Sequence, residues 1–350
     1  MPSRAAGRTP RASSDKRRER HPSLSMVARA AGVALVTASY ALKNNPKISL
    51  ATRDRVRAAA IKLGYVPDPE IGRLMHMLRA GRSASPKSTI ALLSFDSDPR
   101  AERNQYFNSL IQGVEQRARD LGYSTDLISV NPAEVGSARL AKILQSRGIQ
   151  GIVIPPLRHA TQCSTLLDWS QFSIIAATYT AQQIVVHRVV PHHLQIGLLS
   201  LAQLQAKGYK RLGLITEPGD HERVNYSFLA ALAMHQQAGH FARIPARQFS
   251  AQCDLLEWHE KYHPDVILTT EKRQISTLLS ALGPARLGQS PVFLLNHPRD
   301  FAGGGVDQHP EVVGKIALEL LAGQIQRGER GYVEHPTVMM VEGSWIDPQG

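Results

Sequence analysis

Residues 23–69 read SLSMVARAAGVALVTASYALKNNPKISLATRDRVRAAAIKLGYVPDP. Apolar residues recur at helical spacing on both sides of Gly32, which indicates two short helices joined by a glycine turn. A third helix is expected after Pro46, with Ser49 as its N-cap and Gly64 at its C-terminal end. Three short helices with a tight glycine turn are typical of the helix-turn-helix, in which small residues let the first two helices cross closely.

The positive charge of the chain is concentrated around this stretch. The chain has 350 residues with 41 Lys and Arg against 29 Asp and Glu, and residues 1–87 hold 18 of the basic residues but only 5 of the acidic ones. The remainder is therefore almost neutral. A cationic head on a near-neutral body is typical of a nucleic-acid binder whose other domain has a different task. A basic tail without any partner is the alternative that charge alone leaves open.

Composition argues against several other classes of protein. With 43% hydrophobic and 20% charged residues the chain can bury ordinary cores, and it has no run of about 18 apolar residues that would predict a membrane span. Two cysteines, Cys163 and Cys253, are too few for a disulfide framework. The basic first 25 residues lack the apolar centre of a secretory signal. We therefore expect a cytoplasmic protein with no membrane partner, no cofactor and no metal.

The chain before residue 88 is expected to have three parts. Residues 1–22 are rich in Arg, Ser and Pro without an apolar period, which predicts a disordered basic tail. The helix-turn-helix domain is expected over residues 23–68. Residues 69–87 contain a possible short helix and a Ser/Pro stretch, and are expected to form a hinge or linker.

From residue 88 to residue 350 short apolar runs alternate with helical patterns, which predicts an α/β domain of parallel sheets covered on both faces. A helix, a Gly-Tyr pair and a strand follow one another at Gly122 and again at Gly208, which indicates two similar subdomains. A ligand cleft is expected between them. The expected boundaries are about 88–188 and 302–328 for the first subdomain, and about 189–301 and 329–350 for the second.

The N-terminal stretch resembles the DNA-binding headpiece of the lactose-repressor (LacI/GalR) family of bacterial transcription regulators. The matching elements keep the family's spacing without a gap, and they are VARxAGV, the T-x-S of the second helix, ISxxTRxRV and LGYxP. The rest of the chain resembles the family's effector domain more loosely. The resemblance implies an all-α helix-turn-helix headpiece followed by a periplasmic-binding-protein-like α/β effector domain of two parallel-sheet subdomains.

The resemblance also implies that the second helix, Leu35 to Lys43, enters the major groove of double-stranded operator DNA. The base-reading positions of the family fall on Leu35, Val36 and Tyr40. The phosphate-contacting positions fall on Thr37, Ser39, Lys43, Lys47, Ser49 and Thr52. Hydroxyl and ammonium groups hold a protein in register on the DNA backbone, whereas an apolar side chain reads only thymine methyls or shape. Leu35 and Val36 depart from the family, which commonly has a polar residue in this pair, and packing into the core is their alternative role.

The expected linker carries Leu74, which matches the hinge-helix leucine of the family. In the family each subunit of a dimer inserts this leucine into the minor groove and kinks the operator. The resemblance therefore implies a homodimer on a pseudo-palindromic operator. A helix that packs the dimer through Leu74, Met75, Met77 and Leu78 is the alternative.

For the effector domain the resemblance implies a small-molecule effector, such as a sugar, between the subdomains. Asp96, Tyr106, Phe107, Arg223 and Asn296 are the candidate effector-binding residues. An arginine grips carboxylate or hydroxyl pairs, and an aromatic ring stacks on an apolar sugar face. Two pairs of residues depart from the family's pattern: His192-His193 stand where the family usually has Asp-Asn, and Glu271-Lys272 stand near its usual Asn-Asp. A surface ion pair is the alternative role for Arg223.

The segment His259-Glu260-Lys261-Tyr262-His263 spells HExxH, the pattern of zinc peptidases. His263 directly precedes Pro264, which disfavours helical geometry at the second ligand, so we expect both histidines to be exposed at a helix end. The sequence predicts a transcriptional regulator, in particular a repressor, and not an enzyme. A small-molecule-binding protein without operator function and a zinc hydrolase are the alternatives.

Overall fold

The computed structural model describes residues 23–42, 48–65, 88–95, 105–249 and 252–349. The chain divides into two compact units, residues 1–77 and 78–350, and each is described by itself. The expected basic tail at 1–22 and the expected linker at 69–87 lie outside the described residues.

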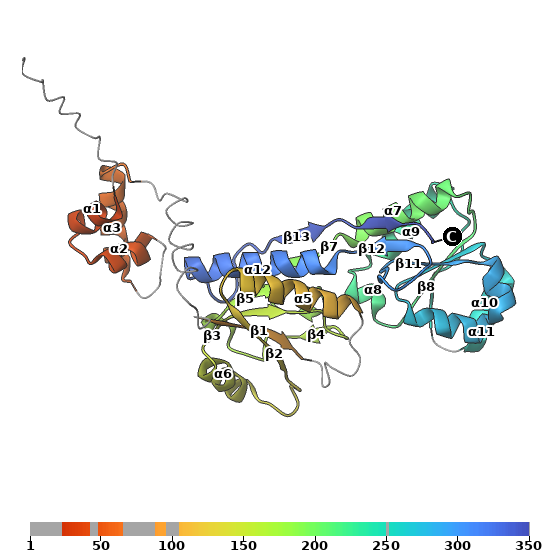
Figure 1. The fold of residues 1–350 in the computed structure, drawn as a ribbon, viewed down its shortest axis with the longest axis horizontal. Helices are drawn as coiled ribbons and strands as arrows, with labels where there is room; N and C mark the ends of the chain where they lie inside the picture. The colour runs from red at the N-terminus through yellow and green to blue at the C-terminus, as the bar shows by residue number, and fades with distance from the viewer. Residues whose placement is uncertain (1–22, 43–47, 66–87, 96–104, 250–251, 350) are drawn as a thin grey trace, which may run out of the picture. The chain divides into compact units, whose positions relative to one another are not determined.

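Three helices make up the described part of the first unit (Figure 1), and they are α1 (Leu24–Ala30), α2 (Leu35–Leu42) and α3 (Leu50–Lys62). Ser49 caps α3 as expected, because its hydroxyl accepts a hydrogen bond from the backbone N–H of Thr52. Gly32 has a φ of 63°, which an L side chain rarely adopts, and it forms the turn between α1 and α2. The small core is built from Val27, Ala28, Ala31, Ala38, Ala41, Val56 and Ala60.

The second unit contains two six-stranded sheets. The first sheet has the order β13-β7-β5-β3-β1-β2 and is parallel throughout. Its strands are β1 (Thr89–Ser94), β2 (Ser124–Ser129), β3 (Ile149–Ile154), β5 (Ser173–Ala176), β7 (His187–Pro191) and β13 (Val338–Val341). Helices α5 (Gln105–Asp120) and α12 (Pro310–Arg327) cover one face. The other face is covered by α6 (Ser137–Ser146), the 3-10 turn η1 (Trp169–Gln171) and the short strands β4 (Thr161–Gln162) and β6 (Ala181–Gln182).

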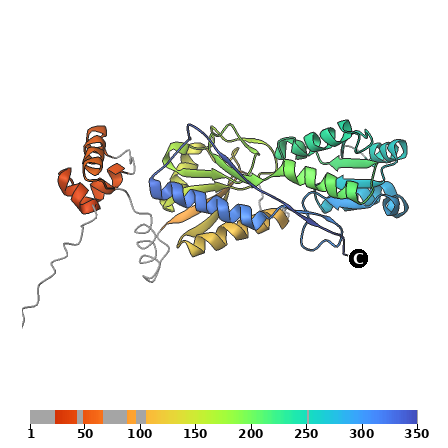
Figure 2. The same cartoon turned by 90° about the horizontal axis from the view of Figure 1, so that it is seen from above.

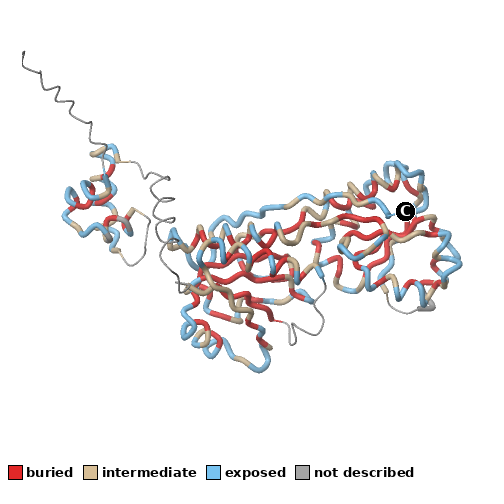
Figure 3. Tube along the Cα trace, in the orientation of Figure 1, coloured by how far each residue is buried: buried red, intermediate tan, exposed pale blue. Residues whose placement is uncertain are grey.

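The second sheet has the order β14-β12-β11-β10-β8-β9, and all its pairs are parallel except that of β12 with β14. Its strands are β8 (Leu212–Thr216), β9 (Arg247–Gln248), β10 (Val266–Thr269), β11 (Val292–Leu294), β12 (Gly305–Asp307) and β14 (Ser344–Ile346). Helices α7 (His193–Ala206) and α9 (Ser227–Gln237) cover one face, and α10 (Gln252–Tyr262) and α11 (Arg273–Gln289) cover the other. The short helix α8 (Asp220–Arg223) follows β8. Buried residues therefore run along the strands of both sheets (Figure 3).

The chain crosses between the two sheets three times, after β7, after β12 and after β13. The crossings after β7 and after β13 are in contact, because the N–H of His192 donates to the carbonyl of Val341 at 2.7 Å. The expected subdomain boundaries near the C-terminus are wrong in two places. Strand β12 belongs to the second sheet, whereas residues 302–328 are expected in the first subdomain. Strand β13 belongs to the first sheet, whereas residues 329–350 are expected in the second subdomain. Strands of three or four residues carry too short an apolar pattern to show which sheet they join.

Helices α5 and α12 lie side by side on the first sheet (Figures 1 and 2) and approach each other until their backbones touch. A Cβ atom on Gly113 would lie 2.2 Å from the carbonyl oxygen of Glu311, and one on Gly314 would lie 2.2 Å from that of Leu110. Only glycine fits at both positions. This tight crossing fixes the N-terminal ends of the two helices, which both reach the cavity described below.

Among the described residues no helix is both long enough and apolar enough to cross a membrane.

Candidate functional site

A cavity of about 1160 Å³ lies between the two sheets of the second unit. Segments that follow β3, β5, β8, β10 and β11 line it, together with the first residues of α5, α7 and α12. The carboxyl ends of parallel strands therefore face the cavity from both sheets. This is where open α/β sheets generally bind their ligands.

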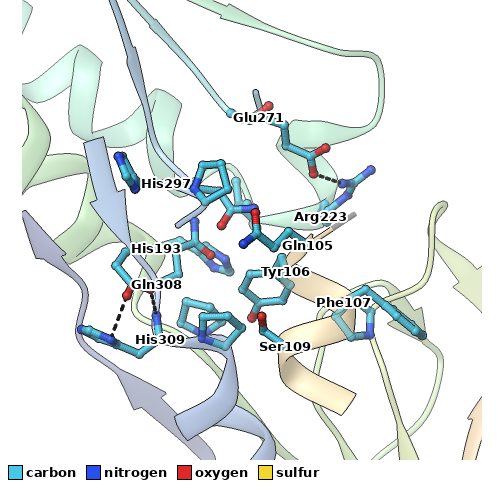
Figure 4. A pocket seen from close by; sticks show the side chains of 18 of the residues that line it. Gln105, Tyr106, Phe107, Ser109, His193, Arg223, Glu271, His297, Gln308 and His309 are labelled. Carbon is cyan, nitrogen blue, oxygen red and sulfur yellow. Dashed lines mark hydrogen bonds and ion pairs between the residues drawn. The ribbon is translucent and has the colours of Figure 1, made fainter. Parts of the chain in front are cut away.

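Arg223 lies at the end of α8 and enters this cavity from the side of the second sheet. Its Nη1 is 3.4 Å from Oε1 of Glu271 (Figure 4), and its Nη2 is 3.4 Å from the backbone carbonyl oxygen of Arg158. Its Nε is buried and has no hydrogen-bond partner among the described residues. The guanidinium is thus held by two long contacts of 3.4 Å each.

A buried carboxylate, Asp220, holds the floor of the cavity beside Arg223. Its Oδ2 accepts hydrogen bonds from the N–H of Glu217 at 2.9 Å, from the hydroxyl of Thr270 at 2.6 Å and from Nε2 of Gln274 at 3.2 Å. Glu271 accepts a hydrogen bond from Nε of Arg273 at 2.8 Å in addition to its pairing with Arg223. The second sheet therefore offers a charged surface in which two carboxylates face two guanidinium groups.

Aromatic rings form a different surface around His193, the first residue of α7. The ring of His193 lies 5.7 Å from that of Phe228, edge to face, and 6.1 Å from that of Tyr179. Burial lowers the pKa of His193 to about 3, with a further contribution from His192, so the ring is uncharged at neutral pH. Its Nδ1 is buried and has no hydrogen-bond partner among the described residues. His193 thus brings an uncharged ring, and not a charged group, to the lining of the cavity.

His192 performs the capping task that an aspartate would perform at the same place. Its Nδ1 accepts a hydrogen bond from the N–H of Gln195 at 3.0 Å, which satisfies a free donor at the start of α7. This departure from the family pattern keeps the cap. The neighbouring departure, His193, instead places a ring in the cavity.

Four of the five candidate effector-binding residues line the cavity: Tyr106, Phe107, Arg223 and Asn296. Phe107 is also buried in the core beneath α5, and it lies apart from the other labelled side chains in Figure 4. Burial raises the pKa of Tyr106, which stays a neutral phenol. Asp96 lies outside the described residues. His193, Asp220 and Thr270 also line the cavity, although none of them is among the expected effector-binding residues. Each closely follows a buried strand, and this position was the signal in the sequence that could have identified them.

In the first unit α2 separates packing residues from exposed ones. Ala38 and Ala41 are completely buried, whereas Leu35 is 51% exposed and Tyr40 is 46% exposed. The alternative role of core packing is therefore wrong for Leu35. The hydroxyl of Ser49 donates to Oγ1 of Thr52 at 2.9 Å, so these two expected phosphate contacts lie next to each other.

Most of the other expected DNA-contacting side chains lie outside the described part of the chain. Thr37 is half-buried. The side chains of Val36 and Ser39 lie outside the described part of the chain, as do Lys43, Lys47 and Leu74.

The HExxH segment does not form a helical pair of ligands. His259 lies in α10 and is buried, with Nε2 3.1 Å from the hydroxyl of Ser290, so the expectation that it is exposed is wrong. His263 is exposed, lies beyond the end of α10 and has a φ of 41°. Within the described residues no group of three or more His, Cys, Asp and Glu side chains is placed to hold a metal ion.

Comparison with known families gives two matches in succession along the chain. The model described as "Bacterial regulatory proteins, lacI family" matches residues 23–68. The model described as "Periplasmic binding proteins and sugar binding domain of LacI family" matches residues 89–274, which is more than half of the chain.

Curated relatives match over part of their length. The sucrose operon repressor of Escherichia coli is 30% identical over 191 residues, which are 54% of this chain and 54% of the repressor. The transcriptional repressor CytR of Escherichia coli (strain K12) is 24% identical over 211 residues, 60% of this chain and 58% of its own length. The chain thus matches a little over half the length of these relatives.

Solved structures resemble the chain over most of its length. A lac repressor dimer bound to operator and the anti-inducer ONPF has a TM-score of 0.55 at 17% identity, covering 93% of this chain and 97% of that one. A complex of the transcriptional regulator CelR with cellobiose also has a TM-score of 0.55 at 17% identity, covering 93% and 98%. At this identity the likeness shows a shared fold.

Proposed function

The chain belongs to the lacI family of bacterial regulatory proteins, and on that premise we propose that it is a sequence-specific DNA-binding transcriptional repressor controlled by a small molecule. The observation that carries the proposal is the arrangement of α2, whose buried alanines leave Leu35 and Tyr40 exposed at the surface of a basic N-terminal region. A recognition helix needs such an outward face to reach base edges in the major groove.

On this proposal Leu35, Val36 and Tyr40 contact bases. Thr37, Ser39, Lys43, Lys47, Ser49 and Thr52 contact phosphates, and Leu74 contacts the minor groove. The protein acts in the cytoplasm as a homodimer on a pseudo-palindromic operator. A dimer doubles the contacts and matches the two-fold symmetry of such a site.

We assign the cavity of the second unit to the effector, with Tyr106, Arg223, Asn296 and His193 as its principal contacts. Asp96 and Phe107 are retained as secondary candidates. Arg223 is flanked by the carboxylates of Asp220 and Glu271, so its charge is already compensated and an anionic ligand would meet both of them. An uncharged ligand with several hydroxyl groups and an apolar face, such as a sugar, suits this surface together with the aromatic rings that also line the cavity.

The mechanism is one of linkage. An effector that binds one relative arrangement of the two sheets more tightly shifts the equilibrium toward it, and operator affinity changes by the ratio of its affinities for the two arrangements. Binding and not catalysis is what this mechanism requires of the cavity.

The test is selection of fragmented genomic DNA of the source organism by the full-length chain, followed by anisotropy titration of the enriched fragments. We expect a shared pseudo-palindrome whose affinity falls steeply as salt concentration rises, because phosphate contacts release counterions. Neutral mono- and disaccharides are then tested for thermal stabilisation of the protein and for release of the DNA. No enrichment over competitor DNA, combined with stabilisation by a sugar, would instead show a small-molecule-binding protein without an operator.

A further inference from the structure

Helix α2 contains none of the side chains that read guanine, adenine or cytosine by paired hydrogen bonds. Its residues are LVTASYAL, without Arg, Lys, Asn, Gln, Asp or Glu. In the major groove guanine is read chiefly by Arg or Lys, adenine by Asn or Gln, and cytosine by Asp or Glu. What α2 can offer to base edges is hydroxyl groups and apolar surface.

The basic side chains that the structure describes in the three-helix unit lie on other elements. Arg29 belongs to α1, and four arginines and lysines belong to α3. One of these, Arg55, is engaged within the protein, because its Nε donates to the carbonyl oxygen of Ala31 at 3.0 Å. The charge of this unit therefore suits the DNA backbone, and the first turn of α2 is left to contact the bases.

Leu35 is the first residue of α2 and is half exposed, although leucine gains from burial. Fully buried Ala38 and Ala41 already supply the face of α2 that packs against α1 and α3. Packing therefore does not require Leu35, and its position in the first turn of α2, not its exposure alone, distinguishes it from the more exposed Leu50 and Ile61. The one base-edge group in the major groove that is apolar is the C5-methyl of thymine.

We infer that Leu35 is a specificity-determining residue that selects thymine in each operator half-site by packing on its methyl group. The inference rests on the proposed function, because it requires α2 to lie in the major groove. It adds the base that is read and the chemical group that is recognised. Removing one contacted methyl should weaken binding about fourfold, the effect of one buried methyl-sized group.

The experiment starts from a random-sequence duplex pool from which the full-length chain selects its preferred site. Each strongly preferred thymine is then replaced by deoxyuridine, which keeps every hydrogen-bonding group and removes only the methyl. At one position in each half-site we expect deoxyuridine to weaken binding by the unmodified chain about fourfold. The same replacement should not weaken binding by the Leu35→Ala variant. Such non-additivity is the sign of a direct contact.

Two further variants sharpen the result. Leu35→Gln should shift the selected base at that position from thymine toward adenine, because glutamine makes paired hydrogen bonds with adenine. Ile61→Ala is the matched control, since Ile61 is an exposed apolar residue of the same unit, at 81% exposure, with no assigned contact to DNA. It should retain both the affinity and the loss caused by deoxyuridine.

The outcomes separate the inference from the proposed function. A selected site at which deoxyuridine has no effect, or has the same effect on Leu35→Ala as on the unmodified chain, overturns the inference and leaves DNA binding standing. A pool from which no sequence is enriched overturns both. Circular dichroism melting of each variant checks that the three-helix unit remains folded.

Discussion

The two sheets of the second unit line the same cavity with different kinds of side chain. On the side of the first sheet, the backbones of α5 and α12 touch at Gly113 and Gly314. The ring of Tyr106 lines the cavity on this side. On the second sheet, Asp220, Arg223 and Glu271 form an ionic network. One wall is held rigidly by backbone contact, and the other by charged side chains that a ligand can engage. Mutations on the first side should therefore change stability most, and mutations on the second should change binding most.

The largest effect is expected at the helix crossing. Gly314→Ala places a Cβ atom 2.2 Å from the carbonyl oxygen of Leu110, so α5 and α12 must move apart. We expect the free energy of unfolding to fall by more than about 3 kcal/mol in denaturant titrations followed by circular dichroism. Gly288→Ala in α11 is the control, because its Cβ would meet no atom within 4 Å. A loss at Gly288 as large as that at Gly314 would contradict the proposed rigidity of the first side.

Arg223→Ala should have the largest effect on binding. It removes the donors that face the cavity and leaves Glu271 with Arg273. We expect about a 30-fold loss of affinity, or ~2 kcal/mol, for whichever sugar stabilises the unmodified protein, measured by calorimetry. Arg286→Ala, in which the pair with Glu260 on α10 and α11 is broken, should bind normally. Equal affinity of Arg223→Ala and Arg286→Ala would remove Arg223 from the site.

His193→Phe should produce a smaller loss. The new ring can still pack on Phe228 and Tyr179, but the unpaired Nδ1 is gone. Effector affinity should fall about tenfold, because phenylalanine has no ring nitrogen for a ligand hydroxyl. Stability without ligand should stay constant or rise, because a buried polar atom without a partner is costly. Unchanged affinity would show that the ring contributes only its shape.

The same residue should make stability depend on pH. The pKa of His193 is about 3 in the folded protein and near 6.5 in the unfolded chain, so the unfolded chain binds the extra proton between these values. Above pH 6.5 the ring is neutral in both states and does not make stability depend on pH. As the pH falls below 6.5, the free energy of unfolding decreases by up to about 1.4 kcal/mol per pH unit. The slope of stability between pH 6.5 and 4.5 should therefore be shallower in His193→Phe. Identical slopes would mean that the ring is protonated in the folded protein.

The smallest effect is expected at the rim of the cavity. Arg299 pairs with Glu311 at 2.9 Å between the two sides, but its side chain is 76% exposed. Solvent weakens such pairs, so Arg299→Ala should cost less than about 0.5 kcal/mol, and 1 M salt should abolish the difference. Thermal melting at low and high salt is sufficient. A large loss that persists in salt would show that this pair holds the two sides together.

Local signals in the sequence account for the first unit. The turn at Gly32 and the cap at Ser49 depend on residues within a few positions of each other, and both are found as expected. The alternation of strands and helices likewise predicts two parallel sheets. The assignments of β12 and β13 fail because each strand is placed by partners far away in the chain.

The candidate site was predictable where one residue type has one clear chemistry. Arg223 is such a case, and it reaches the cavity. His193 and Asp220 were not selected, because their role depends on burial and on partners such as Thr270 and Gln274 that only the fold brings together. The expected exposure of His259 fails for the same reason. Its buried contact with Ser290 joins residues that are far apart in the chain and that only the fold brings together.

Different residues of α2 pack the core and face the surface, and this separation has a consequence for how such proteins diversify. Ala38 and Ala41 secure the helix, while Leu35 and Tyr40 project from it without supporting the core. Substitutions at the projecting positions therefore cost little folding free energy. On the proposed function, such substitutions let a duplicated copy of this chain acquire new target genes while its architecture is kept.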